Sequence, residues 1–91
     1  MSKYRLEIPK QVRRQIDDLP GFYRQQIRQI ITALMDNPRP RNAKALRIFP
    51  NSWQIRLDHY RIVYTIEDTL LIIEVVKVGH KHGPEFYTDI E

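Results

Sequence analysis

Two segments of alternating hydrophobicity, Trp53–Leu57 and Tyr60–Ile66, are separated by only two residues, Asp58 and His59. Alternation of period two is typical of strands with one buried face, and so short a connection predicts a tight hairpin. A two-residue turn fixes the register, because it places the last residue of the first strand, Leu57, opposite the first of the second, Tyr60. The remaining apolar pairs in this register are Ile55 with Ile62 and Trp53 with Tyr64. All six side chains then share one face of the sheet. A register shift of one residue would distribute them over both faces, so the hairpin strongly constrains the fold.

The opposite face of the predicted hairpin carries a pair of like charges. Arg56 lies directly opposite Arg61, with Gln54 and Val63 beside them. Cβ atoms of such cross-strand pairs are about 5 Å apart, and like charges there destabilise the sheet. Because a guanidinium presents a planar fork of donors that fits phosphate or carboxylate, we interpret the pair as an anion-binding site. The alternative is that each arginine pairs with an acidic side chain of the C-terminal tail, namely Glu85, Asp89 or Glu91.

The N-terminal part of the chain predicts one strand and two helices. The segment Tyr4–Ile8 alternates and ends at Pro9, which suits the first turn of a helix. Apolar residues then recur at helical spacing in two runs, separated by a break at Pro20 and Gly21. The first run is Ile8, Val12, Ile16 and Leu19, and the second is Ile27, Ile30, Ile31 and Leu34. We therefore expect an antiparallel pair of helices, the second of which ends at Asn37-Pro38.

The rest of the chain predicts strands. Ala45–Phe49 precedes the hairpin, and the nearly continuous apolar segment Leu70–Val78 follows it and ends at Gly79. Such a segment is typical of a strand covered on both faces. The predicted fold is α+β, in the order β-α-α-β-β-β-β: two antiparallel N-terminal helices packed on a largely antiparallel sheet of four to five strands, with a short C-terminal tail or helix. With 91 residues, the chain is expected to form a single domain, residues 1–91.

Charge and cysteine content narrow the classes of function. The formal net charge is +4, and residues 37–57 contain five basic residues and no acidic one. A one-sided basic surface suggests a polyanion or an acidic protein as partner. The absence of cysteine excludes a disulfide framework, a Cys-ligated zinc finger and thiol chemistry. Because no apolar segment is typical of a membrane span or a secretory signal, we expect a cytoplasmic protein with no membrane partner.

Several motifs occur together in an order that resembles a known family. The predicted helix pair ends in Asn37-Pro38, and the hairpin reads Trp-Gln-Ile-Arg-Leu at 53–57 and Tyr-Arg-Ile-Val-Tyr at 60–64. Val-Gly-His-Lys follows at 78–81, and Tyr87 stands near the end. Together with Leu46 in the preceding basic strand, this pattern resembles the RelE/ParE superfamily of bacterial toxins over essentially the whole chain, and the RelE branch in particular.

The resemblance implies a toxin of a type II toxin–antitoxin system. RelE-type toxins are small ribonucleases that cut mRNA in the ribosomal A site, inhibit translation and are silenced by a cognate antitoxin. The implied partners are therefore mRNA, the ribosome and an antitoxin protein, the last in a toxin–antitoxin hetero-oligomer. Two other functions stay open: a ParE-like inhibitor of DNA gyrase, and a catalytically inactive module that binds an antitoxin. Lys81 and Tyr87, with His80 and His82, favour the nuclease.

The same resemblance assigns roles to individual residues. Arg61 falls at the position of the family's phosphate-binding arginine, and Arg56 matches a basic residue of the preceding strand. Lys81 stands where many members carry an arginine that stabilises the transition state, so the bidentate fork is lost there. Tyr87 matches a C-terminal tyrosine that stacks on a base or helps to activate the nucleophile. Gln54 stands where one enzyme type has a second lysine.

Cleavage of RNA without a metal ion needs a base for the 2′-hydroxyl, positive charge for the phosphorane and an acid for the leaving 5′-oxygen. Nearby cations lower the pKa of a tyrosine or lysine, which favours Tyr87 or Lys81 as the base, and His80 or His82 is suited to act as the acid. The predicted catalytic residues are Arg56, Arg61, Lys81, Tyr87 and His80, and the predicted RNA-binding residues are Gln54, Arg41, Lys44, Arg47 and His82. We expect a metal-independent endoribonuclease with no cofactor, because no acidic or thiol ligand accompanies the histidines.

Overall fold

The computed structural model describes residues 3–47, 49–88 and 90. The helices are α1 (Lys10–Asp17), α2 (Gly21–Ala33) and a short C-terminal 3₁₀ helix, η1 (Pro84–Tyr87). The strands are β1 (Arg5–Glu7), β2 (Ala43–Leu46), β3 (Ser52–Leu57), β4 (Tyr60–Glu67) and β5 (Ile72–His80). The predicted α+β class and element order are therefore confirmed.

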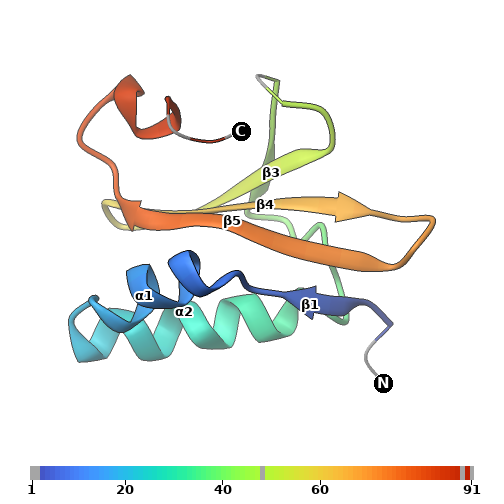
Figure 1. Ribbon diagram of the computed structural model, residues 1–91, viewed down its shortest axis with the longest axis horizontal. Coiled ribbons are helices and arrows are strands. Elements are labelled where there is room, and N and C mark those ends of the chain that lie inside the picture. The colour runs from blue at the N-terminus through green and yellow to red at the C-terminus, as the bar shows by residue number, and fades with distance from the viewer. Residues whose placement is uncertain (1–2, 48, 89, 91) are drawn as a thin grey trace.

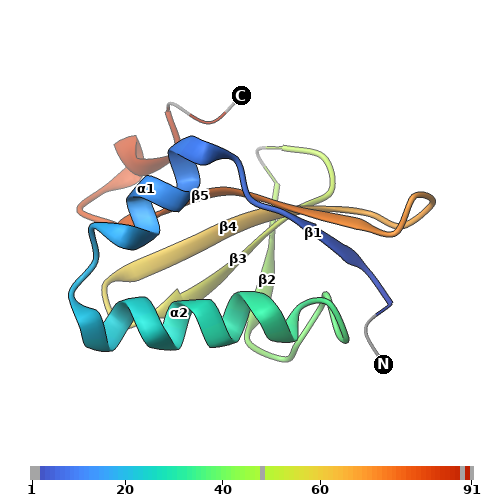
Figure 2. The ribbon, with the colours of Figure 1, turned by 60° about the horizontal axis from the view of Figure 1, so that its bottom comes forward.

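The elements form three layers, with a single five-stranded sheet in the middle (Figure 1). The strand order is β1-β5-β4-β3-β2, and every neighbouring pair is antiparallel except β1 with β5. Both helices cover one face of the sheet, where they run in roughly opposite directions (Figure 2), and η1 lies over the other face. We call the sheet face that η1 covers the outer face. No helix within the described residues combines the length and the apolar character that crossing a bilayer requires.

The hairpin register is the predicted one. Leu57 pairs with Tyr60, Ile55 with Ile62, and Trp53 with Tyr64. Ile55, Ile62 and Tyr64 are fully buried in the core under the helices, and the other three pack against that core. The rest of the core comes from the helix stripes, the end of β4 and β5: Val12, Ile16, Leu19, Ile27, Ile31, Leu34, Ile66, Ile73, Val75 and Val78. The alternation of apolar residues thus correctly assigned the two faces of the sheet.

Several predicted element boundaries are wrong by a few residues. Pro9 precedes α1 instead of lying in its first turn. The predicted strand Ala45–Phe49 is displaced toward the N-terminus, because Ala43 pairs with Ile55 and Leu46 with Ser52. The last strand does not end at Gly79, which pairs with Arg61 inside the sheet. Its predicted start at Leu70 is also early, since Leu71 has a positive φ of 57° in the turn before β5.

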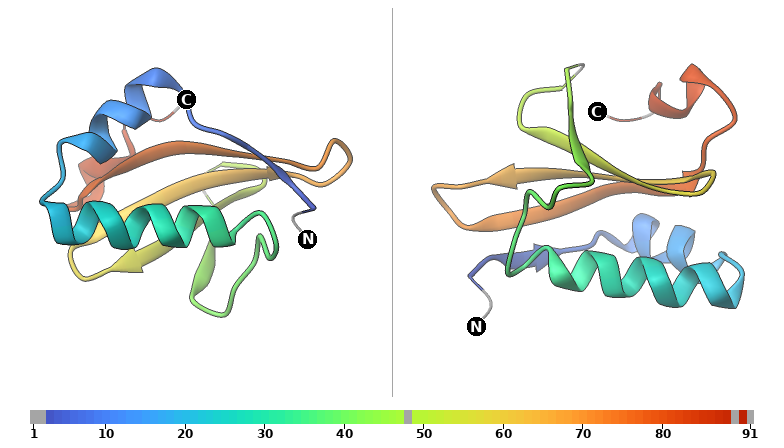
Figure 3. Two further views of the ribbon diagram at one scale, coloured as in Figure 1. Left: turned by 90° about the horizontal axis from the view of Figure 1, so that it is seen from below. Right: turned by 180° about the vertical axis from the view of Figure 1, so that it is seen from behind.

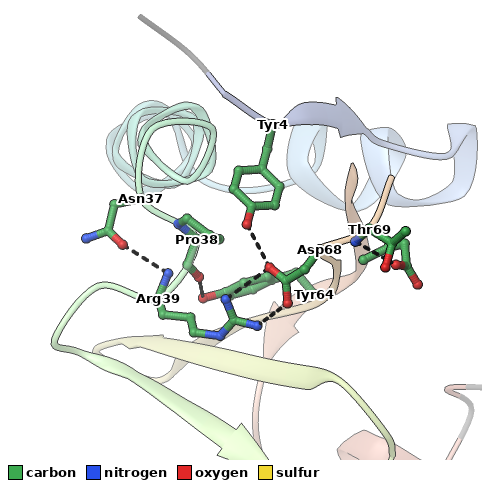
Figure 4. Close-up of polar contacts among 8 residues, drawn as sticks. Tyr4, Asn37, Pro38, Arg39, Tyr64, Asp68 and Thr69 are labelled. Atoms are coloured by element: carbon green, nitrogen blue, oxygen red, sulfur yellow. Dashed lines mark hydrogen bonds and ion pairs between the residues drawn. The ribbon is translucent and has the colours of Figure 1, made fainter. Parts of the chain in front are cut away.

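A polar cluster ties the N-terminus to two distant loops (Figure 4). The Asp68 carboxylate, in the β4–β5 turn, accepts a hydrogen bond from the Tyr4 hydroxyl at 2.7 Å. It also forms an ion pair with Arg39 at 2.8 Å. Below them, burial raises the pKa of Tyr64 to about 12, and its hydroxyl donates to the Pro38 carbonyl at 2.7 Å. The cluster therefore holds the β4–β5 turn, the α2–β2 loop and the start of the chain together.

Replacing Asp68 with asparagine is expected to destabilise the protein in a pH-dependent way. Hydrogen bonds from Arg39 and Tyr4 lower the pKa of Asp68 from 3.8 to about 2. A carboxyl whose pKa is lower in the folded state contributes stability above its unfolded pKa, and this contribution is lost as the pH falls through the folded pKa. Urea unfolding should therefore show wild type more stable than Asp68→Asn near neutral pH, with the difference shrinking between pH 3.8 and about 2. A difference that is independent of pH would contradict this role for the Asp68 charge.

Candidate functional site

The two arginines of the hairpin face away from the helices and lie opposite each other, as predicted. Arg56 pairs with Arg61 across β3 and β4, and the next outer-face pair is Gln54 with Val63. The Arg56 Nε donates to the carbonyl oxygen of Asp58 at 3.2 Å, and an Arg61 Nη donates to the same oxygen at 3.0 Å. A shared backbone acceptor thus draws both guanidiniums toward the hairpin turn and offsets part of their mutual repulsion.

Neither arginine is neutralised by a carboxylate in the described part of the chain. The ion pairs there join Arg5 to Glu7, Arg28 to Asp17, and Arg39 to Asp68. Of the three tail acids considered as alternative partners, Glu85 makes no such pair, and Asp89 and Glu91 lie outside the described residues. Two positive charges therefore face solvent side by side, as an anion-binding site requires.

The turn that holds the arginines is anchored to the helix layer. Asp58 adopts a positive φ of 54°, a conformation that aspartate tolerates better than most residues. Its carboxylate accepts a 2.7 Å hydrogen bond from the hydroxyl of Tyr23 in the first turn of α2. This bond to Asp58 raises the pKa of Tyr23. The turn is thus fixed from outside the sheet, and the shared acceptor carbonyl is fixed with it.

The C-terminal tail folds back onto the outer face. Phe86 is only 6% exposed, and its ring lies close over Gly79, where an added Cβ would be 3.4 Å from the Phe86 Cε1 atom. The Lys77 ammonium sits 4.2 Å from the centre of the same ring and donates to the Phe86 carbonyl. Val63, which pairs with Lys77, is fully buried although it faces away from the helices. Lys77 was not among the predicted site residues; it lies opposite Val63, beside the register shift between Val63 and Tyr64.

This packing brings the predicted tail residues to the hairpin. The Tyr87 hydroxyl donates to the amide oxygen of Gln54 at 2.6 Å. The Lys81 ammonium lies 5.5 Å from the centre of the Tyr87 ring, and the Lys81 backbone N–H donates to the carbonyl of His59 at 2.8 Å. Strand, turn and tail therefore meet on one side of the sheet.

The three histidines lie together at the end of the sheet. The His80 ring centre is 5.4 Å from that of His59 and 4.2 Å from that of His82, with 33° between the ring planes in both pairs. Desolvation lowers the pKa of His80, and the nearby His82, His59 and Arg61 lower it further. His59 is exposed in its turn as expected, but its ring contact with His80 was not predicted.

The remaining predicted RNA-binding residues lie along or beside β2. Lys44 pairs with Gln54 and so faces the same side of the sheet as the arginines. Arg41 precedes β2 and Arg47 follows it, and both are exposed. A hollow of about 260 Å³ opens beside the tail and is lined by Lys77, Gly79, His80, His82, Glu85 and Phe86. A larger hollow of about 420 Å³ lies on the helix side, between α1, α2 and β1, and contains none of the predicted site residues.

Comparisons with known proteins agree on the kind of protein that this chain resembles. The family model described as the ParE toxin of type II toxin–antitoxin system, parDE, matches residues 6–83. The mRNA interferase toxin RelE of Escherichia coli K12 is 26% identical over 88 residues, which are 94% of this chain and 92% of that protein. The putative toxin RelE1 of Methanocaldococcus jannaschii is 27% identical over 86 residues, 89% of this chain and 93% of that protein.

Solved structures extend the similarity to the tail. A free mutant of E. coli toxin RelE matches with a TM-score of 0.80 and 25% identity, over 99% of this chain and 95% of that one. The intact E. coli RelBE toxin–antitoxin complex matches with a TM-score of 0.76 and 26% identity, over 88% of this chain and 99% of that one. The overlap with free RelE therefore includes the C-terminal segment that the family model leaves out.

Proposed function

This chain belongs to the family of ParE toxins of type II toxin–antitoxin systems, and from its outer face we propose that it is an endoribonuclease that cleaves mRNA on the ribosome. Its relatives in E. coli and Shigella flexneri are named as mRNA interferases. The observation that carries the proposal is the Arg56–Arg61 pair, in which Arg56 is exposed and Arg61 half-buried and which has no carboxylate partner among the described residues. A phosphodiester fits such a site, because two adjacent guanidiniums stabilise negative charge on non-bridging oxygens.

The proposed reaction is attack of a 2′-hydroxyl oxygen on the adjacent phosphorus. A base removes the 2′-hydroxyl proton, the new P–O bond forms, and the P–O bond to the 5′-oxygen breaks as an acid protonates that oxygen. The products are a 2′,3′-cyclic phosphate and a 5′-hydroxyl. Arg56, Arg61 and Lys81 stabilise the phosphorane charge, so that protein cations do the work that a metal ion would otherwise do.

The local environment supports His80 as the base, where the sequence had favoured Tyr87 or Lys81. The lowered pKa of His80 keeps its imidazole neutral near pH 7, the form that accepts a proton. The Tyr87 hydroxyl is engaged in donating to Gln54, which supports a positioning role for that ring against a base of the substrate. His82, which lies 4.2 Å from His80 between ring centres, takes the role of the acid.

Two partners accompany this activity. Arg41, Lys44 and Arg47 contact the phosphate backbone of ribosomal RNA, a role that suits exposed basic residues without fixed partners. A cognate antitoxin covers the arginine pair, in line with the toxin–antitoxin complexes solved for related proteins. We propose that the toxin acts in the cytoplasm and that residues 1–91 form one toxin domain.

Expression of the chain alone should arrest growth and translation, and co-expression of the protein encoded by the adjacent gene should restore both. The measurements are incorporation of labelled amino acids, mapping of mRNA 5′ ends, and the superhelical density of a plasmid. New 5′ ends within translated codons support the endoribonuclease. Falling supercoiling with continued translation would instead indicate a gyrase inhibitor, as the name of the matching family allows. An unaffected culture would indicate a module that only binds its antitoxin.

A further inference from the structure

The histidine cluster is built from three separate segments of the chain. His59 belongs to the β3–β4 turn, His80 ends β5, and His82 lies in the connection to η1. His80 is the middle ring, with its centre 5.4 Å from His59 and 4.2 Å from His82, and all three side chains are exposed. The backbone bond from Lys81 to His59 holds the turn against the strand end. The arrangement is therefore imposed by the fold and is independent of any one side chain.

Three neighbouring histidines first suggest a metal centre, but their geometry does not fit one. Metal ions bind imidazole through lone pairs that lie in the plane of the ring. The rings contact one another at centre distances of 5.4 Å and 4.2 Å, with a tilt of 33° between the ring planes in both pairs. The described residues contain no group of three or more His, Cys, Asp or Glu side chains placed to hold a metal. The cluster instead offers flat ring faces to its surroundings.

We propose that the imidazole ring of His59 forms a nucleobase-binding subsite for single-stranded RNA beside the Arg61 phosphate site. This inference rests on the proposed ribonuclease function and adds a second contact to the substrate. Stacking on flat rings tolerates any base, because every base has a π face. Arg61 pairs with Gly79 and Tyr60 pairs with His80 across β4 and β5, so a phosphate held by Arg61 brings its own nucleotide within reach of the histidines.

Charges around the histidine cluster favour a base over an acidic peptide. Glu85 lines the adjacent hollow together with His80 and His82, and Asp58 precedes His59 in the turn. The Glu85 carboxylate repels acidic side chains, whereas a nucleobase is neutral and can accept stacking and donate hydrogen bonds; the Asp58 carboxylate is turned to Tyr23 of α2. Lys77 lines the same hollow, with its ammonium engaged by the ring and the carbonyl of Phe86. The surface thus places a flat ring beside the Arg61 cation, a combination used to bind single strands.

The test compares the binding of two RNA probes by the complete chain. The probes are short, fluorescently labelled oligoribonucleotides with a 2′-deoxy block at the scissile position, one intact and one lacking a single base. Fluorescence anisotropy should show that wild type binds the intact probe about tenfold more tightly than the abasic one. His59→Ala should weaken binding of the intact probe by a similar factor and should bind the intact and the abasic probe equally. His59→Tyr keeps a flat ring, so it should retain the wild-type affinity and the preference for the intact probe.

Phe22→Ala is the matched control. Phe22 is 65% exposed in the first turn of α2, and this helix begins at the same end of the molecule as the β3–β4 turn (Figures 1 and 3). The Phe22 ring contacts Tyr23 and is not part of the histidine cluster. Its loss should leave both affinities unchanged. Equal binding of the two probes by wild type, or unchanged discrimination in His59→Ala, would overturn the subsite. Cleavage of mRNA on ribosomes by wild type is measured in parallel, so a failure of the subsite is distinguishable from a failure of the ribonuclease function.

Discussion

Replacing Arg61 with alanine is expected to lower the rate of mRNA cleavage on ribosomes by about 10²–10³-fold, the usual cost of removing one preorganised donor from a developing oxyanion. Arg61 is held toward the hairpin turn by hydrogen bonds of 3.0 Å to the carbonyls of Asp58 and Tyr60, so its guanidinium is oriented before substrate arrives. A preorganised cation stabilises the phosphorane without a cost of reorganisation at the moment of reaction. The measurement is single-turnover cleavage of a defined mRNA on programmed ribosomes.

Two further variants show whether the effect belongs to the site. Arg14→Ala removes the same charge from α1 on the helix side and should leave the cleavage rate unchanged. The free energy of unfolding of the double variant Arg56→Ala, Arg61→Ala should lie within about 0.5 kcal/mol of the wild-type value. Loss of the like-charge repulsion compensates for the lost hydrogen bonds. Normal cleavage by a folded Arg61→Ala protein would remove Arg61 from the catalytic site.

Replacing Phe86 with alanine is expected to destabilise the packing of the tail by about 3 kcal/mol, in the range measured for large aromatic side chains in protein cores. Phe86 is 6% exposed and packs against Gly79 and Lys77 on the outer face. Its loss should also release Tyr87 from Gln54, so cleavage should fall together with stability. Urea unfolding and amide hydrogen exchange of residues in η1 measure the first effect, and the ribosome assay measures the second.

The controls for this prediction separate tail packing from catalysis. Phe86→Leu keeps most of the apolar volume and should recover most of the stability and activity. Tyr87→Phe removes only the hydroxyl that donates to Gln54, so it should leave the tail packed. If Phe86→Ala unfolds at the same urea concentration as wild type and its tail amides remain protected, the tail does not depend on this contact.

The hairpin was predictable in detail because local chemistry determined it. Two residues between Leu57 and Tyr60 leave one register, and that register alone places Arg56 beside Arg61. The tail could not be placed in the same way. Phe86 and Tyr87 follow no periodic pattern, so nothing in the sequence indicates which face of the sheet they cover. The Phe86 ring lies against Gly79, where an added Cβ would be 3.4 Å from Cε1, although glycine in a sequence more often indicates a turn or loop.

The histidine cluster was missed for a related reason. It forms only because β5 continues through Gly79 to His80, opposite Tyr60. Ending that strand at Gly79, as the sequence suggested, separates His80 from the turn that carries His59. Most residues that the structure brings together here had been predicted as candidates from the sequence, whereas their mutual contacts depend on long-range pairing that periodicity does not encode.

The position of β5 has a consequence for how the toxin is synthesised. β1 pairs with β5, and the Gln15 side chain of α1 accepts a hydrogen bond from the Val78 backbone N–H at 2.9 Å. The first elements to leave the ribosome must therefore wait for one of the last before they can dock, a long-range closure that slows folding. Until then Arg61 has no neighbouring strand on the β5 side and no tail above it. The surface proposed to act on mRNA is thereby assembled only after β5 has been synthesised.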